Sequence, residues 1–367
     1  MSDPRLVRYA QLICEHSLGI DDSHRVHIST PPLGAPLALA AAREAWRRGA
    51  RVSVEMEPEW ARADRLRFGS DEQVAFLDPA ELAAAEQFDR WLFVWASGNT
   101  AERAGIASAR DAALARARAP WLRRHDEREA AGELRWVGAA FPTALGAQTA
   151  RMGTHAWEQF VYSALLLDEE DPVAAWRALS ERHKRLIDRL ADVRELRVVS
   201  AGTDLRVNVE GRVWESCAGE ANLPDGEVFC CPPLGGVEGE ILFDVPSLQS
   251  GRTYRDVRLR FERGVVVEAS AALGEQELIA RIDTDEGARR VGEFAIGTNE
   301  MVQRAVGSTL FDEKIGGTCH LALGRSFPML GGENESAIHW DLICDLRRGG
   351  RIDADGEPLL SDGKLLV

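Results

Sequence analysis

The sequence predicts two domains: an α/β domain with a doubly wound, mostly parallel sheet over residues 1–195, and a strand-rich α+β domain over residues 196–367. Three observations support this prediction. Strands and helices alternate in the first half, strand patterns dominate the second half, and a chain of 367 residues is long enough for two domains.

The first domain is predicted from apolar strands that alternate with Ala-rich helices. The predicted strands are 25–28, 51–56, 91–96 and 134–137, and the helices between them are 36–48 and 100–118. Gly49 follows the first of these helices, as a C-terminal glycine does. Strands separated by helices favour a parallel, doubly wound sheet. Two amphipathic helices, 154–167 and 171–193, follow, and we interpret their apolar stripes as packing faces.

The second domain is predicted from short strands separated by turn residues such as Asp204, Gly251 and Gly264. The predicted strands are 196–200, 205–209, 240–245, 257–261 and 265–269.

Composition narrows the classes of partner. Hydrophobic residues make up 45% and charged residues 28%, which is typical of a globular protein, and the formal net charge is -15. This acidity disfavours nucleic acid and anionic membranes as partners, because both carry negative charge. No glycine-rich phosphate-binding motif supports a nucleotide cofactor.

Location is predicted from the same composition. No apolar run is long enough to span a membrane, and Met1 to Leu12 lacks an apolar signal core. The six cysteines contain no Cys-x-x-Cys pair, which favours reduced thiols in a cytoplasmic protein.

His339 and Asp341 are the first candidate metal ligands. They lie in a predicted strand, and because side chains alternate between the two faces of a strand, both point the same way. An imidazole and a carboxylate on one surface suit a metal ion. A His-x-Asp pair taken alone is more often incidental.

Four further candidates are Glu227, Glu293, Glu313 and His320. Glu227 follows a Pro-Asp-Gly turn and starts a predicted strand, and His320 opens a short apolar strand after two glycines. Glu293 stands among apolar residues, where a carboxylate is costly to bury unless it is paired or bound to a metal. Taken singly, each glutamate could reach solvent and His320 could be a satisfied core histidine.

Together, the six candidates predict a site for two metal ions. They all lie between Glu227 and Asp341, each at a predicted strand edge or glycine turn, and they are too many for one open tetrahedral site. Two ions that share a carboxylate would use them all, and carboxylate with imidazole suits zinc, cobalt or manganese. The other histidines are expected to be surface or structural residues: His16, His24, His27, His125, His155 and His183.

These motifs resemble the thermophilic aminopeptidase family of metallopeptidases, which includes the aminopeptidases T and S. The matching segments are 292–299, 310–314, 320–324 and 336–341, and the likeness extends back through 224–229 and 202–205 to the N-terminal residues 17–19. The resemblance spans nearly the whole chain.

The resemblance implies a function and a set of roles. Family members remove N-terminal residues from peptides that have a free N-terminus, through a water activated by two divalent ions, and they are homodimers with a catalytic C-terminal domain. Carried over by motif, the metal ligands would be Glu227, Glu293, Glu313, His320, His339 and Asp341. Glu293 would bridge the two ions, and Glu293 and Glu227 are the candidate catalytic residues.

One departure from the family pattern concerns Phe327. The family has a tyrosine in the Ser-Tyr-Pro triplet after the first metal histidine, whereas this chain has Phe327 there. The missing phenol puts the efficiency of peptide hydrolysis in question. Two alternatives therefore stay open: an iron ring-cleaving dioxygenase of the same fold that uses His320, His339 and Asp341, or a non-catalytic metal-binding homologue.

Overall fold

The computed structural model describes residues 3–249 and 251–366, and the chain divides into two compact units. The first comprises residues 1–176 with 219–224, and the second comprises 177–218 with 225–367. Within the described ranges, no helix combines the length and the apolar character needed to cross a membrane.

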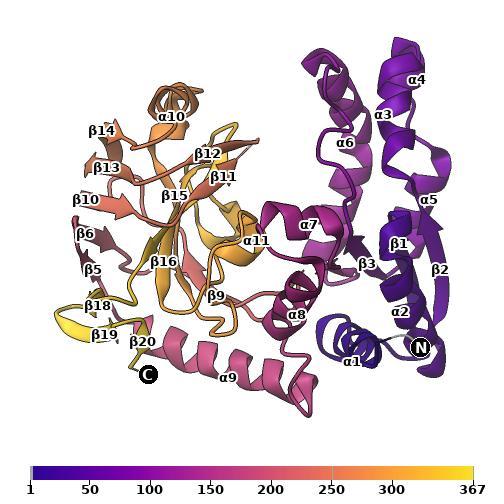
Figure 1. The fold of residues 1–367 in the computed structure, drawn as a ribbon, viewed down its shortest axis with the longest axis horizontal. Helices are drawn as coiled ribbons and strands as arrows, with labels where there is room; N and C mark the ends of the chain where they lie inside the picture. Colours follow the sequence, from indigo (N-terminus) through magenta and orange to yellow (C-terminus); the bar gives the residue numbers. More distant parts are fainter. Residues whose placement is uncertain (1–2, 250, 367) are drawn as a thin grey trace. The chain divides into compact units, whose positions relative to one another are not determined.

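The first unit is built on a five-stranded parallel sheet in the order β2-β1-β3-β4-β8 (Figure 1). The order reverses at β1, as in a doubly wound sheet, and this confirms the predicted fold class. The strands are β1 (Arg25–Thr30), β2 (Arg51–Met56), β3 (Arg90–Trp95), β4 (Arg135–Ala140) and β8 (Asn222–Leu223). The helices are α1 (Arg5–Leu12), α2 (Ala35–Arg47), α3 (Glu59–Phe68), α4 (Asp71–Val74), α5 (Pro79–Gln87), α6 (Ser108–Ala130), α7 (Ala144–Thr149) and α8 (Thr154–Ala164).

The predicted helix 100–118 is partly wrong. Residues 100–105 form turns, residues 106–107 are irregular, and α6 begins at Ser108 and continues through Pro120 to Ala130. A proline removes a backbone donor and usually ends a helix, so the continuation of α6 beyond Pro120 needs support from its packing. The packing of Trp121 with Ala85 of α5 and Trp91 of β3 lies beyond the proline and supports the second half of α6.

The second unit is dominated by two antiparallel sheets. One has the order β14-β13-β10-β6-β5-β18-β19-β20, and the other, which we call the site sheet, has the order β17-β16-β15-β9-β7. Figure 1 labels most of these strands. Helix α9 (Pro172–Leu190) leads into this unit, and α10 (Glu275–Ile282) and α11 (Thr309–Asp312) are its short helices. The predicted α+β, strand-rich class is confirmed for this half of the chain.

The strands of the first antiparallel sheet are β5 (Glu195–Ser200), β6 (Thr203–Asn208), β10 (Val237–Phe243), β13 (Val257–Glu262), β14 (Val265–Ser270), β18 (Arg351–Ala354), β19 (Glu357–Ser361) and β20 (Lys364–Leu365). The site sheet contains β7 (Trp214–Cys217), β9 (Glu227–Cys230), β15 (Val291–Gly297), β16 (Thr318–Gly324) and β17 (His339–Asp345). A separate hairpin pairs β11 (Ser247–Gln249) with β12 (Arg252–Tyr254).

The site sheet separates an apolar core from a polar surface. On β15, Phe294 and Ile296 join the large hydrophobic core of the second unit, together with Leu321 of β16 and Trp340 of β17. Because neighbouring residues of a strand point to opposite faces, Glu293 and Ala295 of β15 face away from that core. The apolar face thereby fixes the register that presents the polar face.

Candidate metal centre

Four adjacent strands and one short helix supply the six predicted ligands. Glu227 is on β9, Glu293 on β15, His320 on β16, and His339 and Asp341 are on β17. Glu313 caps the C-terminal end of α11, just before β16. His320 was expected to open its strand but is the third residue of β16, and Glu293, which follows Gly292, is the third residue of β15.

Small residues make room between the candidate ligands. Ala322 of β16 pairs with Glu293 on one side and Asp341 on the other, and Gly297 of β15 pairs with Glu227. A Cβ added to Gly297 would lie 2.2 Å from the carbonyl oxygen of Ile315, so only glycine fits there. The pleated face can therefore hold a cluster of polar side chains without intervening bulk.

Glu293 lies between the two histidines. Its Oε1 is 3.5 Å from Nε2 of His320, and its Oε2 is 3.4 Å from Nε2 of His339. His339 Nε2 is also 3.5 Å from Oδ1 of Asp341, in agreement with the strand alternation. Each oxygen of one carboxylate thus faces a different imidazole, which is the arrangement expected of a carboxylate shared by two ions.

Several polar atoms in this cluster lack a hydrogen bond. Among the described residues, Oε2 of Glu227 and both ring nitrogens of His320 are buried without one. Buried polar atoms are normally paired, because an unpaired one costs about 1–3 kcal/mol. Glu227 Oε2 and His320 Nε2 are 3.3 Å apart, and the carboxylate of Glu293 lies close to both. A cation bound between Glu227 Oε2 and His320 Nε2 would satisfy these two atoms, so the residues fit a metal.

The six residues form three overlapping groups whose donor atoms lie within 4.8 Å of one another. The groups are Glu227 with Glu293 and His320, Glu293 with His339 and Asp341, and Glu313 with His320 and Asp341. Glu293, His320 and Asp341 each belong to two groups. The structure therefore brings all six predicted residues together, in an arrangement with more than one possible ion position.

The electrostatics of the two histidines favour positive charge. Burial lowers the pKa of His320, but contact with Glu293 and the charge of Glu227 outweigh it and raise the pKa to about 9. Burial also lowers the pKa of His339, whereas Asp341 and Glu293 raise it to about 11. The surrounding carboxylates thus attract a cation to the position between these rings.

The two glutamates have opposite shifts. Burial raises the pKa of Glu293, but the imidazoles of His320 and His339 lower it to about 2. Burial raises the pKa of Glu313 to about 8; Lys314 opposes this rise, and the charge of Glu227 adds to it. Glu313 therefore lies where negative charge is in excess.

Two charged residues of this cluster, Asp225 and Lys314, were not predicted from the sequence. The ammonium of Lys314 pairs with Glu227 and Glu313, and lies 3.5 Å from Asp225. A lysine in a turn is ordinarily exposed, so its position next to Glu313 did not identify it. The composition could have pointed to it, because Lys314 is one of only three lysines among 44 basic residues.

Phe327 lies beside this cluster. Its ring centroid is 5.3 Å from that of His339 and 5.4 Å from that of Phe229. Phe327 immediately precedes a 3-10 turn (Pro328–Leu330) and is partly buried. The departure from the family pattern therefore falls next to a predicted metal ligand.

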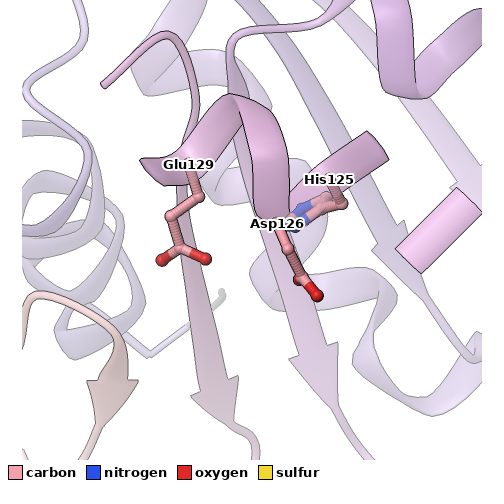
Figure 2. A group of neighbouring side chains, drawn as sticks. All are labelled: His125, Asp126 and Glu129. Atoms are coloured by element: carbon pink, nitrogen blue, oxygen red, sulfur yellow. The ribbon is translucent and has the colours of Figure 1, made fainter. Parts of the chain in front are cut away.

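A second group of possible ligands lies on α6, where Figure 2 shows His125, Asp126 and Glu129. The two acids are exposed, and Glu129 accepts a hydrogen bond from Trp136 Nε1 at 2.8 Å. His125 is buried and its ring stacks on Trp121, so it is a structural residue, as predicted. One turn of helix supplies all three side chains, in contrast to the five elements of the cluster in the second unit.

One protein family matches nearly the whole chain. The profile of the thermophilic metalloprotease (M29) family matches residues 2–365. Aminopeptidase T of Thermus aquaticus is 34% identical over 62% of this chain, but that match spans only 60% of the relative's own length. Aminopeptidase 2 of Geobacillus stearothermophilus is 27% identical over 99% of this chain and 95% of the relative.

Two solved structures share the fold across the chain. Wild-type AmpT from Thermus thermophilus superposes with a TM-score of 0.82 at 25% identity and covers 99% of both chains. The 2,5-dihydroxypyridine dioxygenase of Pseudomonas putida has a TM-score of 0.66 at 15% identity, with 100% of this chain and 98% of that one covered, and shows a similar fold only. Since the family profile covers nearly every residue, the chain belongs to the thermophilic metalloprotease (M29) family.

Proposed function

We propose that this protein is an aminopeptidase that uses two divalent ions, held by Glu227, Glu293, Glu313, His320, His339 and Asp341. One observation carries the proposal: the two oxygens of Glu293 face two different histidines, each within 3.5 Å, next to buried donor atoms that have no hydrogen bond. Catalysis would belong to the region 196–367, which contains all six residues.

The charges of the cluster match two divalent ions. Asp225, Glu227, Glu293, Glu313 and Asp341 carry five negative charges when ionised, and Lys314 offsets one of them. Neutral imidazoles add none. The four remaining charges equal those of two divalent cations, and carboxylate with imidazole suits zinc, cobalt or manganese.

The bound ions, Glu293 and Glu227 have distinct proposed tasks. Two bound ions would supply Lewis-acid activation of a peptide carbonyl and of a water. Glu293 would set the spacing of the ion positions by facing both, and Glu227 would complete the position next to His320. The carboxylates would also favour a substrate that brings a positive charge, which the free amine of a peptide does.

The alternative of a single-iron dioxygenase is less consistent with the geometry. It requires His320, His339 and Asp341 around one ion, as in a facial triad. Across the described residues, no group of donor atoms within 4.8 Å of one another contains both histidines. Glu293 would also remain without an ion between the two histidines, and Glu227 and Glu313 would keep only Lys314 as a cationic partner.

We also propose that the protein is a homodimer located in the cytoplasm. Size-exclusion chromatography tests the oligomeric state, and cell fractionation tests the location.

A pair of peptides tests the proposed function. The full-length protein, loaded in turn with zinc, cobalt and manganese, should release the first residue from a peptide with a free N-terminus. It should leave the N-acetylated copy of that peptide intact, and a chelator should stop the reaction until metal is restored. Mass spectrometry follows the products. Absence of cleavage with all three metals, together with oxygen uptake on a dihydroxypyridine in the presence of iron(II), would establish the dioxygenase instead.

A further inference from the structure

Lysine is rare in this chain. Only Lys184, Lys314 and Lys364 occur among 44 basic residues, and the remaining 41 are arginines. Lys184 and Lys364 are exposed, whereas Lys314 is 1% exposed. Burying an ammonium is costly unless carboxylates pair with it. A lysine at a buried position of an arginine-rich chain therefore indicates partners that fit an ammonium better than a guanidinium.

The ammonium of Lys314 has three carboxylate partners. Its Nζ lies 2.5 Å from Oε1 of Glu227, 2.8 Å from Oε1 of Glu313 and 3.5 Å from Oδ1 of Asp225. An ammonium has three N–H donors and no acceptor, so three carboxylate oxygens are a matching set. A guanidinium is larger and planar, and would not reproduce this geometry.

The backbone fixes the position of this side chain. The Lys314 carbonyl accepts a hydrogen bond from Asn299 N at 3.0 Å, and its own N–H donates to Phe311 O at 3.1 Å. The side-chain amide of Asn299 in turn donates to Asp225 O at 2.8 Å. Lys314 and its partner Asp225 are thus both hydrogen-bonded to Asn299.

The ammonium stands where a further metal ion could otherwise bind. Donor atoms of Cys217, Asp225 and Glu227 lie within 4.8 Å of one another, as in a metal site. Lys314 contacts both acids of this group. Its contact with Oε1 of Glu227 leaves Oε2, which has no hydrogen bond, 3.3 Å from Nε2 of His320.

We propose that Lys314 is a positioning residue of the metal centre: its ammonium acts as a fixed internal cation that holds Glu227 and Glu313 by one oxygen each and directs the second oxygen of Glu227 toward the ion position beside His320. The inference rests on the proposed two-metal centre. It concerns the metal ligands and not the substrate, because Lys314 is only 1% exposed.

The first variant is Lys314→Met, which has a similar length and no charge. Loss of a residue that orients metal ligands typically weakens metal affinity or activity about 10–100-fold. We expect that weakening for at least one ion, measured by chelator competition, together with a changed cobalt(II) absorption spectrum. With saturating metal, kcat should fall by a similar factor while KM stays within about threefold. Lys184→Met, at an exposed lysine, should match the wild type in every measurement.

A second variant separates charge balance from positioning. Lys314→Met combined with Asp225→Asn removes one positive and one negative charge, so the net charge of the cluster is kept. If Lys314 positions the glutamates, this double variant should fold and still show the altered cobalt spectrum, weakened metal affinity and low kcat. Recovery of all three to within about threefold of wild type would show that Lys314 only balances charge, and would overturn the proposal.

Two other outcomes would also overturn it. One is a Lys314→Met protein with wild-type metal affinity and cobalt spectrum. The other is failure of both variants to fold with metal in excess, which would make Lys314 a folding residue. The wild-type protein in the same series tests the proposed function separately. If it binds metal without cleaving peptides, the aminopeptidase proposal fails, while the affinity ratio between variant and wild type still decides the role of Lys314.

Discussion

The groups of histidine and carboxylates on α6 and on the site sheet contain the same residue types but differ in how the chain supplies them. On α6, His125, Asp126 and Glu129 come from one turn of helix, and both acids face solvent. In the second unit, the ligands come from four strands and α11, and Glu227, Glu293 and His320 are nearly inaccessible. Each group contains a buried histidine nitrogen without a hydrogen bond, so the difference lies in the acids: those of α6 are solvated, whereas Glu227 and Glu293 are buried. The comparison teaches that residue types alone do not define a metal site, because a buried carboxylate needs a cationic partner and a solvated one does not.

The largest expected effect separates the two groups by a matched pair of substitutions. Glu293→Gln keeps the size of the side chain but removes the charge that faces both His320 and His339. We expect turnover to fall by about 10³-fold, the upper end of the cost of removing one electrostatic group from an active site. A peptide-cleavage assay measures turnover, and elemental analysis should find less metal than in the wild type.

Glu129→Gln on α6 is the control for that prediction. The amide oxygen can still accept the hydrogen bond from Trp136, and an exposed substitution usually changes stability by no more than about 0.5 kcal/mol. Metal content and turnover should therefore stay at wild-type values. An equal loss of metal in this variant would mean that the α6 group also binds an ion.

A smaller effect concerns His183, a buried histidine whose hydrogen-bond partners are hydroxyls. His183 contacts Ser216 Oγ at 2.9 Å and Thr298 Oγ1 at 2.7 Å, and burial, with the charges of Arg182 and Lys314, lowers its pKa to about 3. The unfolded state binds the proton below about pH 6.5, so this contribution to stability is complete above that pH and is lost as the pH falls toward 3. Between pH 6.5 and 4.5 the loss should be about 2–3 kcal/mol.

Urea unfolding of the metal-free protein checks this sign. His183→Gln removes the titrating group, so its unfolding free energy should change less over that pH range than the wild-type value does. If both proteins lose the same stability, His183 is protonated in the folded state. His320, beside carboxylates, has a raised pKa, whereas His183, beside hydroxyls, has a lowered one. Equal losses would mean that the neighbouring groups do not cause this difference.

The smallest effect is predicted at Phe327. Its ring lies next to His339, and Phe327→Tyr would place a hydroxyl near the proposed ions. We expect turnover of an aminoacyl-p-nitroanilide to rise about tenfold, below the 10²–10³ of a full oxyanion donor, because a water can partly fill that role. Unchanged or reduced turnover with the same metal content would show that this site does not use the phenol.

Local patterns predicted much of this architecture. Strand β2 occupies the predicted residues 51–56, and the two-residue period correctly placed His339 beside Asp341. The predicted helix 100–118 missed the second half of α6, where packing around Trp121 stabilises a helix that continues through Pro120. Single-residue propensities contain no information on such packing.

The candidate site could be predicted only in part for a similar reason. The residue types of Glu293 and His320 were predicted from the sequence, but the space around them comes from Ala322, Ala295 and Gly297, which pair with or beside the ligands across the sheet. That space depends on which strands pair, which is a long-range property. Lys314 was missed because two of its three partners, Asp225 and Glu227, are distant from it in the sequence.

The metal content of the wild-type protein tests the central claim most directly. After loading with excess zinc, cobalt or manganese and removal of unbound metal, elemental analysis should find two ions per chain, and Glu129→Gln should give the same value. That result follows from six converging donors and from four negative charges that Lys314 leaves unbalanced. One ion or fewer per chain, with every metal in excess, would contradict a two-metal centre on the site sheet.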